Sequence, residues 1–149
     1  MQNLHKSSYI LMYAGTIPFI FCTYSIAFKT SPIWFPVATE TALTTYTLLI
    51  GSFMAGIHWG QHLSNEAYRP RLLAMVSNLI TLSFWFALSA SQLNIFLIIS
   101  AGLFMLLLVI DFLLMLNNFI PKHYCFHRSI VSLVVIINLL TSALFFATN

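Results

Sequence analysis

Residues 54–62, with the sequence MAGIHWGQH, end a long apolar segment and bring together small residues, two histidines and a tryptophan. If this segment is helical, Ser52, Gly56 and Gly60 recur at every fourth residue. This is the small-xxx-small spacing that lets two transmembrane helices approach each other closely. We therefore predict a helix whose small-residue face, defined by these three residues, packs at the centre of a helical bundle.

A neighbouring stripe of the same helix carries His58 and His62, which are four residues apart. Residues at this spacing lie on one face with their Cβ atoms about 5–6 Å apart, so both imidazoles can point at one ligand or one cavity. The simpler interpretation is structural: His62 lies at the headgroup level, and His58 bonds to a backbone carbonyl of a neighbouring helix. A metalloprotease is excluded, because Trp59 occupies the place of the general-base glutamate of H-E-x-x-H.

The composition places the whole chain in a membrane. Of its 149 residues, 60% are hydrophobic and 6% are charged, whereas a soluble domain has roughly a quarter charged residues. The formal charge of +3 is too small and too scattered for a nucleic-acid partner, so we expect membrane lipids around the chain and no nucleic acid. The two cysteines give no disulfide framework.

Five apolar segments are long enough to cross a hydrocarbon core of about 30 Å at about 1.5 Å per residue. They predict membrane-spanning helices over about residues 9–28, 41–62, 71–90, 93–116 and 129–147. Two residues, Ser91 and Gln92, separate the third span from the fourth, which predicts an antiparallel hairpin. Pro18 predicts a kink in the first span, and Pro70 suits the first helical position of the third. No repeat or interdomain linker is visible, so residues 1–149 are predicted to form a single domain.

The positively charged residues are divided unequally between the two sides of the membrane. With five spans, the N-terminal side holds Lys6, Arg69, Arg71, Lys122 and Arg128, and the other side holds Lys29. The positive-inside rule then places the N-terminus in the cytoplasm and the C-terminus outside. The predicted fold is an all-α integral membrane protein, a five-helix bundle in this orientation.

This topology brings ionisable residues from three separate segments to one depth on the cytoplasmic side. They are His58, His62, Asp111, His123, His127 and Arg128. Asp111 stands out because a carboxylate about five residues, or roughly 8 Å, inside the fourth span must face protein, water or a cation. Its expected partner is Arg128 or His58. One such pair, pinning the fourth helix to the fifth, would account for these residues without any function.

Four functional interpretations of the same layer stay open. Bis-histidine haem ligation would need His58 to face His123 or His127, and a transition-metal site would combine such histidines with His62 and Asp111. A proton path would use Asp111 and His58. A hydrophobic ligand such as a quinone would lie beside the tryptophan of residues 54–62 and bond to a histidine. The sequence by itself selects no cofactor among these.

Several short motifs resemble those of one family. Residues 13–19, YAGTIPF, are similar to its G-x-I-P-F element, and residues 52–60, SFMAGIHWG, to its S-F-x-G-G-x-x-W-G element. Asp111 stands where the fourth helix of the family carries an acid, and residues 121–128, PKHYCFHR, resemble its P-x-W-Y-x-x-x-R turn. Over essentially its whole length the chain resembles an uncharacterised group of small bacterial inner-membrane proteins. That group is catalogued as a domain of unknown function, and its animal relative is the mitochondrial transmembrane protein 69.

The resemblance implies five helices and residence in the bacterial inner membrane, or the mitochondrial inner membrane in a eukaryote, and it implies no established activity. The leading hypothesis is therefore a non-catalytic accessory or interaction subunit of a larger membrane complex, and association with further copies of the chain as a homo-oligomer is a second option. It rests on the residues themselves, in which no nucleophile and base pair, phosphate loop or complete metal motif is visible. The alternative is an intramembrane ligand, haem, metal or proton site on the cytoplasmic side, built from His58, His62, Asp111 and His123 or His127.

Overall fold

The computed structural model describes the backbone of residues 9–30, 37–64 and 70–148, with the side chains of 62–64, 70, 71 and 148 left out. All regular structure in these residues is helical. A helical stretch over residues 9–14 precedes the five labelled helices. These are α2 (Ile17–Ala27), α3 (Thr39–Ser64), α4 (Pro70–Ala90), α5 (Leu93–Leu116) and α6 (Lys122–Thr148).

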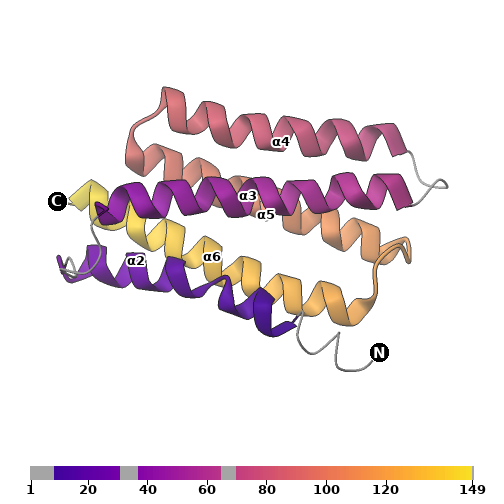
Figure 1. Ribbon diagram of the computed structural model, residues 1–149, viewed down its shortest axis with the longest axis horizontal. Helices are drawn as coiled ribbons and strands as arrows, with labels where there is room; N and C mark the ends of the chain where they lie inside the picture. Colours follow the sequence, from indigo (N-terminus) through magenta and orange to yellow (C-terminus); the bar gives the residue numbers. More distant parts are fainter. Residues whose placement is uncertain (1–8, 31–36, 65–69, 149) are drawn as a thin grey trace.

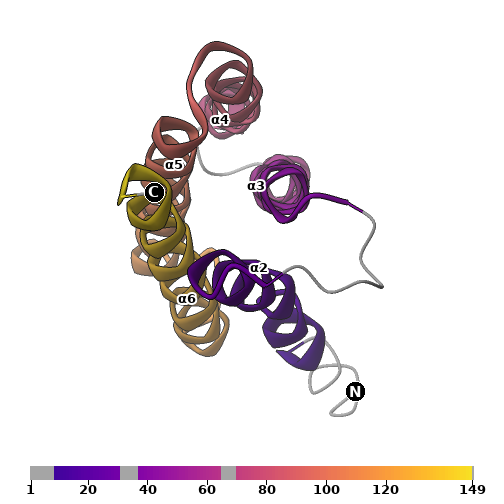
Figure 2. The same ribbon diagram turned by 90° about the vertical axis from the view of Figure 1, so that its left-hand side faces the viewer.

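The helices lie side by side in two layers (Figures 1 and 2). One layer contains α2, α3 and α4, and the other contains α5 and α6. Helix α3 contacts α2 and α4 within its own layer and α5 across the interface, while α6 contacts α5 and α2. Helices α4 and α5 contact each other on either side of the short connection at Ser91 and Gln92, as the predicted hairpin requires. The helical stretch 9–14 and the C-terminal end of α6 lie at opposite ends of the bundle (Figure 1).

The bundle carries apolar side chains on its outside and many of its polar side chains inside. Leu49 and Phe53 of α3 are exposed, whereas Thr47 of the same helix and Ser100 of α5 are fully buried. Four helical segments of the described residues are long and apolar enough to cross a membrane: Tyr9–Ala27, Leu72–Ala90, Leu93–Leu116 and Lys122–Ala147. The chain is therefore a multi-pass membrane protein. The span predicted over 41–62 corresponds to α3, which is 26 residues long but is not among these four.

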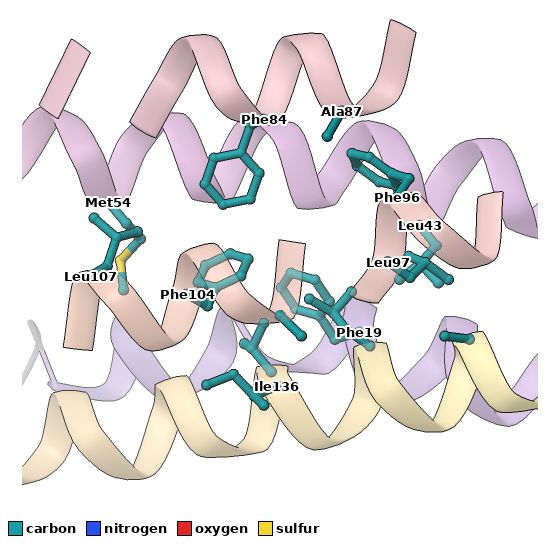
Figure 3. Close-up of a cluster of buried hydrophobic side chains, with 14 of the residues drawn as sticks. Phe19, Leu43, Met54, Phe84, Ala87, Phe96, Leu97, Phe104, Leu107 and Ile136 are labelled. Carbon is teal, nitrogen blue, oxygen red and sulfur yellow. The ribbon is translucent and has the colours of Figure 1, made fainter. Parts of the chain in front are cut away.

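Aromatic rings fill the space between the two layers (Figure 3). The rings of Phe84 in α4 and Phe104 in α5 meet edge to face with their centroids 5.4 Å apart. Phe19 in α2 meets Phe104 in the same way at 6.4 Å. The ring of Phe84 also reaches the backbone of α3, because a Cβ atom added at Gly51 would lie 2.6 Å from it. The ring of Phe84 thus occupies the space that a side chain at Gly51 would need.

The small-residue face of α3 does not lie at the centre of the bundle. Gly56 and Gly60 are exposed, and a Cβ atom on either would meet nothing within 4 Å. The buried stripe is the neighbouring one, which contains Gly51, Ala55 and His58. The prediction of which face packs inside the chain was wrong, because the ring of Phe84 packs against the neighbouring stripe, where Gly51 leaves space for it.

The fifth helix begins earlier than the sequence indicated. It was predicted to start at Ser129, but α6 starts at Lys122, directly after Pro121, whose carbonyl accepts a hydrogen bond from the Cys125 N–H at 3.1 Å. Helix α5 ends at Leu116, and Asn118, two residues later, has a left-handed φ of 60°, a conformation that asparagine tolerates after a helix. The chain therefore reverses within a few residues, and Arg128 lies in the second turn of a helix rather than in a loop.

The first span is broken just before Pro18 rather than smoothly kinked. Residues 9–14 are helical, residues 15 and 16 form a turn, and α2 follows with Pro18 in its first turn. The Tyr46 hydroxyl of α3 donates a hydrogen bond to the Gly15 carbonyl at 3.0 Å. The Thr16 hydroxyl donates to the Tyr13 carbonyl at 2.8 Å. Side chains thus satisfy backbone groups at the break, as a membrane interior demands.

Candidate functional site

Asp111 is the centre of a buried polar network that joins three helices. Its exposed fraction is 0%, and those of His58 and Arg128 are 1% and 2%. Arg128 of α6 donates its Nε–H to Asp111 Oδ2 at 2.6 Å. His58 Nε2 of α3 lies 2.9 Å from Asp111 Oδ1, and because an ionised carboxylate only accepts, Nε2 is the donor of that bond. Asp111 therefore has both partners that the sequence proposed for it.

Arg128 makes further contacts within its own helix. Its Nη1 donates to the Tyr124 hydroxyl at 3.2 Å, and its guanidinium carbon lies 5.9 Å from the centre of the Tyr124 ring. Its Nη2 is buried and has no hydrogen-bond partner among the described residues, and the same is true of His58 Nδ1. A buried donor without a partner costs free energy. Arg128 Nη2 is therefore available to donate a hydrogen bond to a ligand, and such a bond would remove that cost.

The helix ends place this network at one end of the bundle. Asp111 lies five residues before the end of α5 at Leu116, and His58 lies six residues before the end of α3 at Ser64. Arg128 lies six residues after the start of α6 at Lys122. At about 1.5 Å per residue these positions are roughly 8–9 Å inside the helix ends. These three side chains therefore lie at one level of the bundle, close to the same end.

A cavity of about 420 Å³ adjoins the network. Its wall comes from the first span, α3, α5 and α6, and is mostly apolar. The lining residues are Leu11, Met12, Gly15, Ile50, Phe53, Met54, Ile57, Phe104, Tyr124, Arg128, Val131, Ser132 and Val135. Arg128 is the charged residue of this set, and Tyr124 and Ser132 supply hydroxyl groups. Cavities of this volume with a few polar groups on an apolar wall are typical of small-molecule sites.

Of the other predicted site residues, His123 and His127 do not join this network. The side chain of His62 lies outside the described residues. His123 is exposed. The Nδ1 atom of His127 is hydrogen-bonded to the Tyr13 hydroxyl at 2.8 Å, and its ring lies 4.4 Å from that of Tyr9, measured between centroids. His127 therefore belongs to a separate aromatic cluster at the same end of the bundle.

This arrangement bears on the haem and metal interpretations. The described residues contain no group of three or more histidine, cysteine, aspartate or glutamate side chains placed to hold a metal ion. His58 is engaged with Asp111, and His127 is engaged with Tyr13, so the structure does not bring these two imidazoles face to face. Neither interpretation gains support from the geometry. The quinone interpretation changes as well, because the cavity lies beside Arg128 and Tyr124 and is not lined by Trp59.

Sequence reasoning placed Tyr124 in a family motif but not among the site residues, although its hydroxyl bonds to Arg128 and it lines the cavity. The signal was present, since Tyr124 and Arg128 are four residues apart after Pro121, and this spacing places two side chains on one face of a helix that starts there. The cavity itself leaves no signal in the sequence, because its lining residues come from four separate segments.

Comparison with known proteins identifies a family. A family model described as "Protein of unknown function (DUF3429)" matches residues 4–144. No curated protein and no solved structure matches the chain.

Proposed function

The chain belongs to DUF3429, a family of unknown function, and we propose from its geometry that it binds a small apolar molecule within the membrane. The binding site is the cavity between the first span, α3 and α6, headed by Arg128 and Tyr124. One observation carries the proposal: an arginine that is 2% exposed lines an apolar cavity and keeps an unpartnered N–H.

The Asp111 network has a clear role in this proposal. A buried guanidinium is costly unless it is paired, and Asp111 supplies that pairing from α5 through Arg128 Nε. His58 fixes the other carboxylate oxygen from α3. Since Nε and Nη1 are held by Asp111 and Tyr124, the orientation of the guanidinium plane is set before any ligand arrives. Such preorganisation lowers the entropy cost of binding.

A cavity-filling substitution tests the proposal. Val131 lines the cavity from α6, and Val131→Phe places a ring where the ligand would lie. Leu133→Phe is the matched control, because Leu133 is on the same helix but is exposed on the outside of the bundle. Binding of radiolabelled 2-undecanone is measured by equilibrium dialysis against the protein in detergent micelles, with protein-free micelles subtracted.

We expect saturable binding by the unaltered protein and by Leu133→Phe, and a loss of at least about tenfold in affinity for Val131→Phe. Circular dichroism confirms that both variants are folded. Saturable binding that is unchanged in a folded Val131→Phe variant would show that the cavity is not the site.

A second proposal concerns protein partners. A role as a non-catalytic subunit of a larger complex in the bacterial inner membrane is supported by the small-residue face, since Gly56 and Gly60 are exposed in the isolated chain. This spacing suits a close helix neighbour. Purification in a mild detergent tests it, and reproducible isolation as a lone monomer would refute it.

A further inference from the structure

We infer that the cavity selects a ligand whose polar end is an uncharged hydrogen-bond acceptor, such as a ketone, ester or quinone carbonyl, over a carboxylate of the same length. This inference rests on the proposed function, because it names the chemical class of ligand for the same cavity. It follows from the charges and the donors at the head of the cavity and from the apolar wall below them.

The charges at the head of the cavity already balance. Arg128 contributes one positive charge, and Asp111, 2.6 Å from its Nε, contributes one negative charge. The other described residues that line the cavity are uncharged. An anionic ligand would therefore add a negative charge that no cation of the wall compensates, and burial of an unpaired charge is strongly unfavourable. A neutral head group avoids this cost.

At the same end of the cavity, the residues offer more hydrogen-bond donors than acceptors. Arg128 has five N–H donors and no acceptor, and its Nη2 has no partner among the described residues. The Tyr124 hydroxyl accepts from Arg128 Nη1, so its own proton is not used in that bond. A ligand oxygen with two lone pairs can accept from both residues. An alcohol or amine head would bring donors of its own and match this end of the cavity less well.

The other residues that line the cavity determine which kind of ligand body fits below the polar end. Leu11 and Met12 of the first span face Ile50 and Ile57 of α3 and Val135 of α6 around the same space. These side chains offer no hydrogen bonds, so an alkyl chain or an apolar ring system fits below the carbonyl. Two sources in a membrane have this chemistry: a free lipophile with a carbonyl, and the ester-linked acyl chain of a bilayer lipid.

The test compares two eleven-carbon probes, 2-undecanone and undecanoic acid, with the purified full chain in detergent micelles at pH 8, where the acid is ionised. Equilibrium dialysis gives a dissociation constant for each probe. We expect the ketone to bind at least about tenfold more tightly than the carboxylate. Tyr124→Phe removes one donor while keeping the ion pair, and it should weaken ketone binding about fivefold. Tyr24→Phe, an exposed tyrosine of α2 that does not line the cavity, should change nothing.

The outcomes separate this inference from the proposed function. Equal affinities, or tighter binding of the carboxylate, would overturn the inference and leave the cavity as a binding site. Tighter carboxylate binding would further show that the His58, Asp111 and Arg128 network carries a net positive charge. Absence of saturable binding by either probe would overturn both proposals.

A further measurement shows which kind of membrane molecule supplies the carbonyl group. Diacyl phosphatidylcholine is added to the micelles at increasing mole fraction. If the apparent dissociation constant of 2-undecanone rises with saturable competition, the natural occupant is an ester-linked lipid chain. If the constant stays unchanged, the occupant is a free lipophile. Both results uphold a neutral carbonyl as the head group.

Discussion

Each carboxylate oxygen of Asp111 accepts a hydrogen bond from a different helix, Oδ1 from His58 of α3 and Oδ2 from Arg128 of α6. A carboxylate that is fully buried at this depth is stable because both oxygens accept charge-assisted or polar hydrogen bonds. The same arrangement makes each partner depend on Asp111, since Arg128 has no other acidic neighbour among the described contacts. Loss of the carboxylate would strand a buried cation.

The first prediction follows at this scale. Asp111→Asn keeps the shape of the side chain but removes its charge, so Arg128 becomes an unpaired buried cation. We expect the free energy of unfolding to fall by about 3–5 kcal/mol, measured by denaturation of the protein in micelles followed by circular dichroism.

The double variant Asp111→Leu with Arg128→Met is the control, because it removes both charges together. It should regain most of the lost stability, since apolar replacement of a whole buried pair is often neutral or better. It should also lose binding of 2-undecanone, because the donor of the cavity is gone. An Asp111→Asn variant that unfolds at the midpoint of the unaltered protein would contradict the prediction.

Sequence reasoning identified the buried network around Asp111 but not the residues that surround it. A buried carboxylate requires a cation or a donor, and the chain has few of either within reach, so His58 and Arg128 followed from chemistry and topology. His123 and His127 have the same polarity and lie nearby in sequence, yet the helix turns them to other faces. Residue type gives no information about the direction of a side chain until the start of the helix is known.

At the scale of the helix, the packing of α4 against α3 depends on one position of α3 that has no side chain. Gly51 leaves room for Phe84, whose ring would otherwise lie 2.6 Å from a Cβ atom. Phe84 is fully buried and packed on Phe104, so its ring has little freedom to withdraw. The contact between the two helices therefore depends on this glycine.

The second prediction compares two glycines of the same helix. Gly51→Ala overpacks the interface with α4 and should destabilise the protein by about 1–3 kcal/mol. Gly56→Ala adds the same methyl group where nothing lies within 4 Å, so it should be neutral or slightly stabilising through helix propensity. Thermal unfolding of both variants in micelles measures the difference. An equal effect at the two positions would contradict the packing described for α3.

The helix boundaries show what hydropathy can and cannot predict. The bounds of α5 agree with the prediction over 93–116, because its ends are marked by polar residues and its length fits a membrane. The start of α6 was missed, because Lys122, His123 and His127 were interpreted as a loop. Polar residues in the first two turns of a helix look the same in a sequence as polar residues in a loop, and Pro121 was the better guide to where helix begins.

At the scale of the whole molecule, the distribution of cations predicts an orientation in the membrane. Arg128 is buried in an ion pair and no longer counts as a loop charge. With five crossings, Lys6, Arg69, Arg71 and Lys122 still fall on one side, against Lys29 on the other. This imbalance is large enough for the positive-inside rule to predict an N-terminus in the cytoplasm.

The third prediction tests that orientation and the crossing of α3 together. Alkaline phosphatase fused after residue 149 should be active, and a fluorescent protein at the same place should be dark, because the positive-inside rule predicts a C-terminus outside. Fusions at the N-terminus serve as the opposite control. A fluorescent C-terminal fusion would show that the chain crosses the membrane an even number of times or in the reverse direction.

Because the two oxygens of Asp111 bind side chains of two different helices, the two hydrogen bonds become possible at different times during synthesis of the chain. A ribosome makes His58 first, Asp111 53 residues later and Arg128 another 17 residues after that. When α5 has been made, its carboxylate can pair with His58 but not yet with Arg128. The ion pair forms only after α6 has been made, so α6 supplies the cation that balances the buried charge of Asp111.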